Sequence, residues 1–199
     1  IIIIIIMTEI LEKTAYHESG HIIMAYLNKY FCEETEILPN GDGKSTFNYG
    51  SDLLTITAIT NFKDEPDIFN NLSESIKRNC PEIAFKSTLV LIAGSIAESI
   101  YLNDGISGEE MDVEISGPDL IRIENINFLL SQINLNHKTD FIPEMMYTAM
   151  TIFADKKIWD TITILAKSLF NKNNKKLSKS EIETILTDCG FVEYLKKKQ

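Results

Sequence analysis

The chain has 199 residues, of which 44% are apolar and 24% are charged, and this composition is typical of a globular protein that buries a sizeable core. Its formal net charge of -10 argues against a nucleic-acid-binding protein, which would present a basic surface. The cysteines Cys32, Cys80 and Cys189 form no C-x-x-C pair, so we expect free thiols, no cysteine zinc site and a cytoplasmic protein. No run of residues reaches the ~18 apolar residues of a membrane span, so we expect no membrane span.

The first six residues are isoleucines that precede Met7, without the charged start or the cleavage site of a secretory signal. We interpret residues 1–6 as a tag or as unassigned residues, and residues 7–199 as a single domain. Residues 8–31 predict a helix, because apolar residues recur there at helical spacing and Thr8 can cap its start.

The next part of the chain predicts a small sheet followed by a buried helix. Residues 35–60 are rich in turn formers and then in Thr and Ile, which predicts one or two strands around a Gly-rich turn. Residues 68–80 predict a helix, and Pro81 is expected to start another element. Residues 87–102 are apolar on nearly every face, as in a central buried helix.

The second half of the chain predicts further helices. An acidic loop with three glycines covers residues 103–118, and Pro118 stands where the next helix should begin. Residues 143–155 and 157–171 predict two more helices. The stretch "LSKSEIETILTDCGF" predicts a short last helix, with Ser178 or Ser180 as its cap and Gly190 as its end. The predicted fold class is mainly α with a small β-sheet.

The stretch "HESGH" at residues 17–21 is the motif with the clearest chemistry. His17 and His21 are four residues apart, so on a helix they lie on one face, where two imidazoles can bind one zinc ion. Glu18 could accept a proton from a water molecule at the metal and later pass it to a leaving amine. The plainer alternative is a core helix that carries two partly buried neutral histidines. Gly20 costs ~1 kcal/mol against alanine inside a helix, which predicts that another group approaches closely there.

A catalytic zinc site needs a third protein ligand and one open position. Position 27 is Leu, so a third histidine six residues after His21 is ruled out, and His137 is interpreted as a surface residue. The third ligand should therefore be a carboxylate. The candidates are Glu98, Asp104, Asp112 and Asp119.

Two of these carboxylates have distinctive settings. Glu98 is a lone acid on an apolar helix, so it should have a partner. It could accept the N–H of a ligand histidine from the second coordination shell, or it could make a structural hydrogen bond or ion pair. Asp119 lies in the first turn of a predicted helix, where the helix dipole favours a carboxylate whether or not a metal is bound.

Four stretches, in this order along the chain, resemble the FtsH-like zinc peptidases. "AYHESGH" (15–21) resembles the A-Y-H-E-A-G-H of that family, and "IAGSIAESI" (92–100) resembles its L-G-G-R-A-A-E-E-L. "SGPDLIRIE" (116–124) is similar to its G-A-x-N-D-L-x-x-A, although Pro118 replaces the usual Asn, and residues 162–186 are similar to its closing pattern. The resemblance implies an HExxH helix packed with a helical bundle. It also implies a Zn²⁺ ion held by His17, His21 and Asp119, with Glu18 as the general base.

The function that this resemblance implies is a zinc-dependent endopeptidase. In the membrane-bound members the peptidase domain follows an ATP-driven unfoldase. We expect this chain to lack the unfoldase, because Met7, taken as its natural start, is only ten residues before His17. We therefore expect short or unfolded polypeptides as substrates, or a separate unfoldase or adaptor as a partner, and an extended peptide held along a strand region at residues 46–60. The alternatives are a catalytically silent protein that binds peptides or a partner on the same fold, and a zinc hydrolase that acts on a non-peptide amide.

Overall fold

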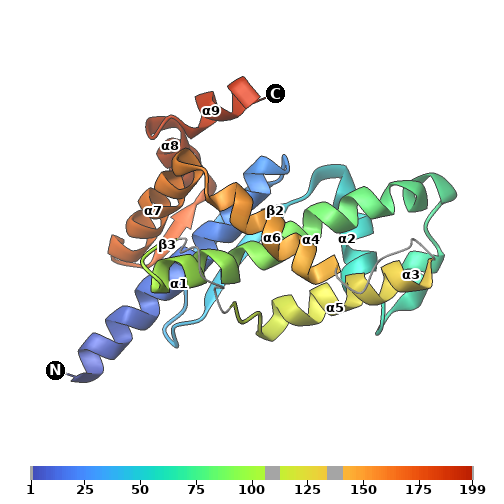
Figure 1. Cartoon of the computed structure of the whole chain (residues 1–199), viewed down its shortest axis with the longest axis horizontal. Helices are drawn as coiled ribbons and strands as arrows, with labels where there is room; N and C mark the ends of the chain where they lie inside the picture. Colours follow the sequence, from blue (N-terminus) through green and yellow to red (C-terminus); the bar gives the residue numbers. More distant parts are fainter. Residues whose placement is uncertain (1, 106–112, 134–140, 199) are drawn as a thin grey trace.

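The computed structural model describes residues 2–105, 113–133 and 141–198, and for residues 2–6 it describes the backbone alone. In these ranges the chain is mainly helical with a small three-stranded sheet, so the predicted fold class is confirmed at that level (Figure 1). The elements in chain order are α1 (Ile2–Leu27), β1 (Phe31–Ile37), β2 (Gly43–Asn48), the 3-10 turn η1 (Gly50–Asp52), α2 (Leu53–Thr60), α3 (Pro66–Asn70), α4 (Glu74–Leu102), α5 (Gly117–Gln132), α6 (Phe141–Phe153), α7 (Lys156–Asn171), β3 (Lys176–Ser178), α8 (Lys179–Asp188) and α9 (Phe191–Lys198).

Helices α1 and α4 form the centre of the molecule. Helix α1 packs against α4, against α7 and against the sheet, while α4 also contacts α2, α5 and α6. The crossing of α1 and α4 is close, because a Cβ atom added to Gly20 would lie 2.6 Å from the Cβ of Ala97 and would also clash with the carbonyl oxygen of Ala93. This confirms that Gly20 marks a close approach, and the group that approaches is the backbone of α4.

Helix α4 is buried on nearly every face from Ser87 to Ile100, as its apolar sequence predicted. By length and composition it is able to cross a membrane, which differs from the expectation that no segment would be. Its most apolar stretch is 83% buried against the other elements, and the central helix of a globular core can have the same length and composition.

The sheet is antiparallel, with the strand order β2-β1-β3. Strands β1 and β2 form a hairpin whose turn includes Gly41, at a φ of 92° that favours glycine. Strand β3, which the sequence did not predict, pairs with β1 through Thr35 and Leu177 from more than 140 residues away along the chain. Strand β2 is left at one edge of the sheet, and the sheet packs against α1.

Some local predictions were wrong, and the first concerns the end of the predicted strand region. Residues 53–60 form helix α2 and not a strand, because their buried side chains, Thr55, Ile56, Ala58 and Ile59, face α4 and α5 at helical spacing. The packing of this face outweighs the preference of Thr and Ile for strands. Consequently, the strand region that was expected to hold a peptide ends at Asn48.

The starts of α1 and α4 also differ from prediction. Helix α1 already includes Ile2, so Thr8 lies inside it instead of capping its start, and α1 ends at Leu27, before β1 begins at Phe31. Helix α4 continues through Pro81, because Cys80 and Ile83 on either side of the proline belong to the same buried face.

The C-terminal helices follow the capping signals of the sequence. Ser178, one of the two predicted caps, is the N-cap of α8 and forms a capping box with Glu181, and Gly190, at a φ of 74°, follows the end of α8 as predicted. The side chain of Asp155 caps α7 by accepting hydrogen bonds from the backbone N–H groups of Lys157 and Ile158. Helix α9, which the sequence did not predict, follows Gly190.

Candidate metal centre

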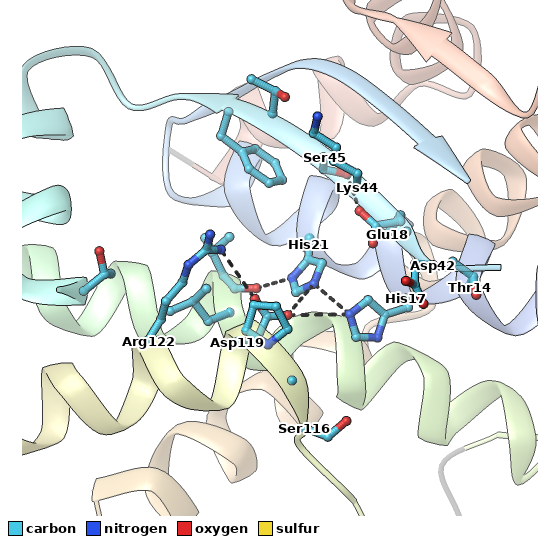
Figure 2. Close-up of a pocket in the computed structure, with 18 of the residues that line it drawn as sticks. Thr14, His17, Glu18, His21, Asp42, Lys44, Ser45, Ser116, Asp119 and Arg122 are labelled. Carbon is cyan, nitrogen blue, oxygen red and sulfur yellow. Dashed lines mark hydrogen bonds and ion pairs between the residues drawn. The ribbon is translucent and has the colours of Figure 1, made fainter. Parts of the chain in front are cut away.

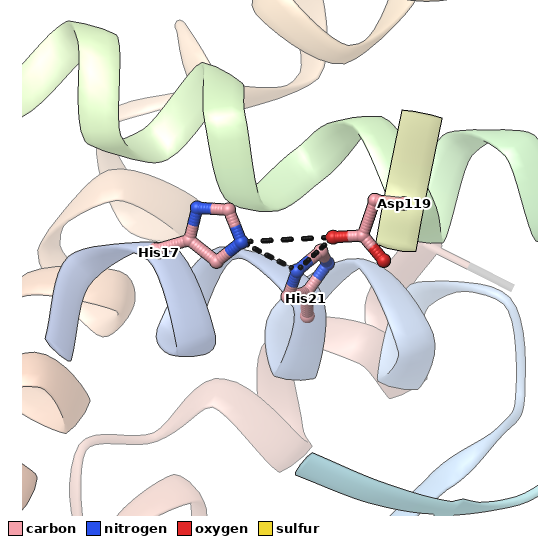
Figure 3. Close-up of side chains that lie close together, drawn as sticks. All are labelled: His17, His21 and Asp119. Carbon is pink, nitrogen blue, oxygen red and sulfur yellow. Dashed lines mark hydrogen bonds and ion pairs between the residues drawn. The ribbon is translucent and has the colours of Figure 1, made fainter. Parts of the chain in front are cut away.

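Helices α1 and α5 bring two histidines and one carboxylate to a single point. His17 and His21 project from one face of α1, and Asp119 projects from the first turn of α5 (Figure 3). The two Nε2 atoms are 2.9 Å apart, and Oδ2 of Asp119 lies 3.1 Å from Nε2 of His21 and 3.7 Å from Nε2 of His17. Gly117, at a φ of 64°, precedes Pro118 at the start of α5 and so turns the chain into this helix.

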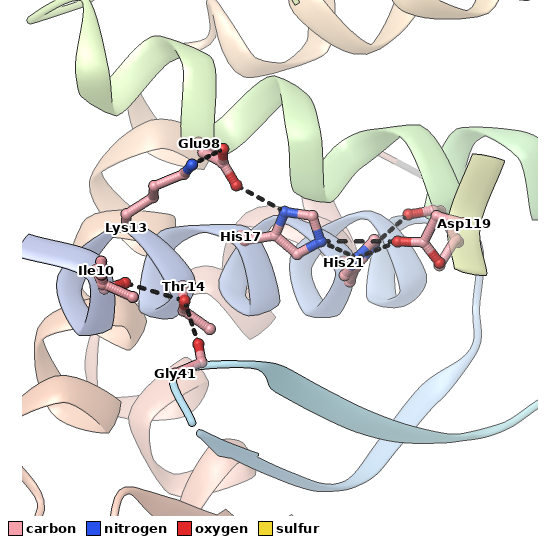
Figure 4. Close-up of polar contacts among 9 residues, drawn as sticks. Ile10, Lys13, Thr14, His17, His21, Gly41, Glu98 and Asp119 are labelled. Atoms are coloured by element: carbon pink, nitrogen blue, oxygen red, sulfur yellow. Dashed lines mark hydrogen bonds and ion pairs between the residues drawn. The ribbon is translucent and has the colours of Figure 1, made fainter. Parts of the chain in front are cut away.

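The outer contacts of the imidazoles fix which ring nitrogens face the cluster. Nδ1 of His21 donates to the carbonyl oxygen of Val90 at 2.7 Å. Nδ1 of His17 donates to Oε2 of Glu98 at 3.1 Å (Figure 4). Both acceptors lie on α4. Because each Nδ1 carries the donated proton, each neutral ring presents the lone pair of Nε2 to the cluster, which is the arrangement that a metal ligand needs.

Two observations show that this cluster could hold a metal ion. Two facing Nε2 lone pairs beside a carboxylate oxygen repel one another unless a proton or a cation lies between them. The backbone of α4 leaves room beside the rings, since a Cβ added to Gly94 would lie 2.6 Å from Nε2 of His17 and would also clash with Nε2 of His21. A set of two imidazoles and one carboxylate is common in catalytic zinc sites, so the donor set fits zinc.

The charges of the cluster are strongly coupled. Burial opposes a charge on His17, but its hydrogen bonds with Asp119 and Glu98 outweigh burial and raise the pKa of this imidazole to about 9. Burial favours the neutral acid at Asp119, but His17 and His21 together hold the pKa of this carboxyl well below its usual range. The metal-free cluster therefore keeps a proton at neutral pH, and a metal ion would displace it.

Glu98 has two partners, one on each carboxylate oxygen. Oε2 accepts from His17, and Oε1 lies 2.8 Å from Nζ of Lys13 (Figure 4). Burial disfavours the ionised form of Glu98, but the hydrogen bonds from His17 and Lys13 lower its pKa overall. Glu98 therefore contacts a candidate ligand histidine and also forms an ion pair, and its role in a second coordination shell stays a prediction.

The other carboxylate candidates that the structure describes, Glu98 and Asp104, do not join the cluster. Within the described ranges, the group of metal-ligating side chains around the histidines contains Asp119 and neither Glu98 nor Asp104. Asp104 lies just beyond the end of α4, at a φ of 54°. Asp112 and His137 lie outside the described residues. The role of Asp119 as a zinc ligand stays a prediction, although its position fits that role.

Glu18 lies on the other side of α1, toward the sheet. Its side chain is 5% exposed, and the hydroxyl of Ser45 on β2 donates to Oε2 at 2.5 Å (Figure 2). Glu18, the two histidines and Asp119 all line one cleft of about 1000 Å³. The rest of this cleft is formed mainly by β2, α2 and α4, including Phe47, Leu53, Ile56, Val90 and Leu91, and by Tyr49, which follows β2.

Several residues around this site carried no signal in the sequence. Ser45, Thr35 and Lys13 are common polar types in unremarkable positions, and only the fold places them beside Glu18 and Glu98. Arg122 lines the cleft one helical turn after Asp119, with Nη1 at 3.7 Å from Oδ1 of this carboxylate. The arrangement depends on contacts between residues far apart in the chain, which local patterns do not reveal.

A scan against models of known protein families finds no match for this chain, and a search of curated proteins finds none either.

Proposed function

We propose that this protein is a zinc-dependent endopeptidase with an FtsH-like peptidase fold, which hydrolyses short or unfolded polypeptides in the cytoplasm. The observation that carries the proposal is the convergence of His17, His21 and Asp119 in the same cleft as the buried carboxylate of Glu18. A core helix with two incidental histidines would need neither a third donor at the same point nor an acid beside it.

Each residue of the cleft would have a distinct role. His17, His21 and Asp119 would hold the zinc ion, which when bound acts as a Lewis acid that polarises the scissile carbonyl and makes a water molecule more acidic. Glu18 would accept the proton of the attacking water and then return it to the leaving amine. Glu98 and the carbonyl oxygen of Val90 would keep the two imidazoles oriented by holding their Nδ1 protons.

The edge strand β2 supports a polypeptide substrate. It borders the cleft from Gly43 to Phe47 and pairs with β1 on one side, and within the described residues no strand pairs with its other edge, where an extended peptide could add. An edge strand binds extended backbone, which folded proteins seldom expose. A folded substrate would therefore need a separate unfoldase or adaptor as a partner.

The test is zinc content together with the hydrolysis of fluorescently labelled casein by wild type and by the Glu18→Gln variant. We expect about one zinc per chain in both proteins, and a loss of hydrolysis of at least ~100-fold in the variant, because the amide cannot accept the proton. The matched control is Glu82→Gln, an exposed acid of α4 that pairs with Lys86. This control should keep full activity.

Three results would contradict the proposal in different ways. Equal hydrolysis by wild type and Glu18→Gln would remove Glu18 from the chemistry. Bound zinc with no hydrolysis of any polypeptide would favour the silent binding protein or a hydrolase for another amide. A wild-type protein that binds no zinc would remove the metal centre itself.

A further inference from the structure

Strand β2 supplies two residues to the side chain of Glu18. Gly43 and Ser45 are two positions apart, so they lie on the same face of the strand, and this face meets α1 at Glu18. Ser45 Oγ lies 2.5 Å from Oε2 of Glu18 (Figure 2). The same oxygen lies 2.8 Å from Oγ1 of Thr35 on β1. The three side chains thus form a row from the sheet to the cleft.

The number of protons sets the direction of this row. A serine hydroxyl has one proton, and a carboxylate oxygen can only accept. Ser45 is placed as the donor toward both Glu18 and Thr35, so its single proton goes to the stronger acceptor, the carboxylate of Glu18. Hydrogen bonds to an ionised group are shorter and stronger than those between neutral groups. Thr35 is fully buried, so water does not compete for its hydroxyl.

Gly43 holds the carboxylate from its other side. A Cβ atom added to Gly43 would lie 2.6 Å from Cδ of Glu18 and would clash with Oε1 as well. The strand backbone thus forms a wall against which the carboxylate rests, and any larger residue at position 43 would push it away. Ser45 and Gly43 together restrict Glu18 to one position.

We propose that Ser45 is a positioning residue for the general base, with the buried Thr35 beside its hydroxyl. This inference rests on the proposed function, because it takes Glu18 as the base. Strand β2 then has two tasks, since it borders the bound peptide and also holds the group that serves the reaction. Holding both on one rigid strand keeps the distance between base and substrate backbone nearly constant.

The first experiment measures kcat and KM for Ser45→Ala, Ser45→Thr and Thr35→Val on a fluorogenic peptide. We expect Ser45→Ala to lower kcat about 10- to 100-fold, the scale of one lost hydrogen bond to a charged group, with KM within about twofold and zinc content unchanged. Ser45→Thr should recover most of the rate, because it keeps the hydroxyl. Thr35→Val should lower kcat less, because Ser45 can still donate.

The matched control is Ser168→Ala, which removes an exposed serine hydroxyl of α7 that donates to the carbonyl oxygen of Ile164. Its kcat should equal that of wild type. An unchanged kcat in Ser45→Ala would overturn the positioning role, and so would a fall in rate that Ser45→Thr does not recover, since that result points to packing and not to the hydroxyl.

The second experiment does not depend on activity. A double-mutant cycle of Ser45→Ala and Glu18→Ala, followed by urea unfolding of the metal-free protein, measures the coupling between the two side chains. We expect the effects of the single changes on the folding equilibrium constant to be non-additive by more than about fivefold. Additive effects would overturn the contact.

The two experiments separate this inference from the proposed function. If wild type binds zinc but hydrolyses no polypeptide, the peptidase proposal fails, and the cycle alone decides whether Ser45 holds Glu18. If wild type is active and the coupling is present but kcat is unchanged in Ser45→Ala, the peptidase proposal stands and the positioning role fails.

Discussion

The two sides of helix α1 at the cleft are built in different ways. On one side His17 and His21 face helices α4 and α5, where charged and polar atoms meet at one point (Figure 3). On the other side Glu18 faces strand β2, where the hydrogen bond comes from the neutral hydroxyl of Ser45 (Figure 2). Under the proposed function, metal binding would depend on contacts with α4 and α5 and proton transfer on contacts with β2, so either should be removable while the other remains.

The electrostatics of the two sides differ accordingly. The histidine side has alternating partners, from Lys13 through Glu98 and His17 to Asp119, and the pKa values of these groups depend on one another (Figure 4). Such a chain of charges would stabilise a cation in the cluster and orient the side chains that hold it. The Glu18 side instead fixes the direction of one carboxylate through hydroxyl groups, which is a matter of geometry.

The largest expected effect is on the histidine side. His21→Ala should abolish stoichiometric zinc, because it removes both a candidate ligand and the hydrogen bond that anchors this ligand to Val90. Elemental analysis of the purified variant measures this. Asp160→Asn, a change on the exposed surface of α7, is the control that should keep its zinc. One zinc per chain in His21→Ala would place the metal site elsewhere.

Asp119→Asn should weaken zinc binding by more than the ~10- to 100-fold that is typical of outer contacts, because a neutral amide is a poor zinc ligand. Competition with a chromogenic chelator measures the dissociation constant. Glu18→Gln, measured in parallel, should keep the wild-type affinity for zinc, because Glu18 lies on the sheet side of α1 and is not a proposed ligand. An Asp119→Asn variant with unchanged affinity would show that this carboxylate does not bind the metal.

The site residues that lie close together along the chain were the ones that the sequence could predict. His17, Glu18 and His21 lie within one helical segment, so their spacing alone placed the two histidines on one face. Asp119 was one of four open candidates, and only the resemblance to a family favoured it. Its approach to the histidines depends on the packing of α5 near α1, more than 90 residues away in the chain, which no local pattern encodes.

The fold was likewise predictable where a local pattern existed, and not where packing or strand pairing decided the structure. Long apolar periodic segments, such as residues 87–102, were recognisable as helices. Helix α2 was mistaken for a strand because Thr and Ile favour strands locally, while its packing against α4 and α5 decided the outcome. Strand β3 has three residues, too few for a pattern, and it exists because β1 offers it an edge.

A smaller effect is expected for Glu98→Gln. The amide can still accept from Nδ1 of His17, but it loses the charge that pairs with Lys13 and that supports the imidazole, so zinc affinity should fall by ~10- to 100-fold. The same chelator competition measures it, with Glu82→Gln on the same helix as the control. An affinity equal to that of wild type would leave Glu98 with a structural role alone.

The smallest effect is expected for a substitution far from the cleft, which should not alter the contacts on either side of α1. Asp155→Ala removes the cap of α7, which accepts from the N–H of Lys157 at 2.9 Å and from the hydroxyl of Tyr194 on α9 at 2.7 Å. Loss of an N-terminal cap costs about 1 kcal/mol in the free energy of unfolding. Zinc content and hydrolysis should not change, because α7 contributes no residue to the cleft.

The pH dependence of this stability difference distinguishes a lost carboxylate from lost packing. The hydrogen bond from Tyr194, followed by those from the backbone, lowers the pKa of Asp155 below its usual value, so the folded state favours the ionised carboxyl. Its contribution is therefore present above the unfolded pKa of about 3.9 and is lost as the pH falls through the lower folded value. Urea unfolding of wild type and Asp155→Ala should give the full difference at pH 7 and a shrinking one below about pH 4. If the difference in unfolding free energy stays constant down to the lowest pH at which the protein folds, the side chain acts through packing. A change in the zinc affinity of Asp155→Ala would show that α7 and the metal centre are coupled through α1.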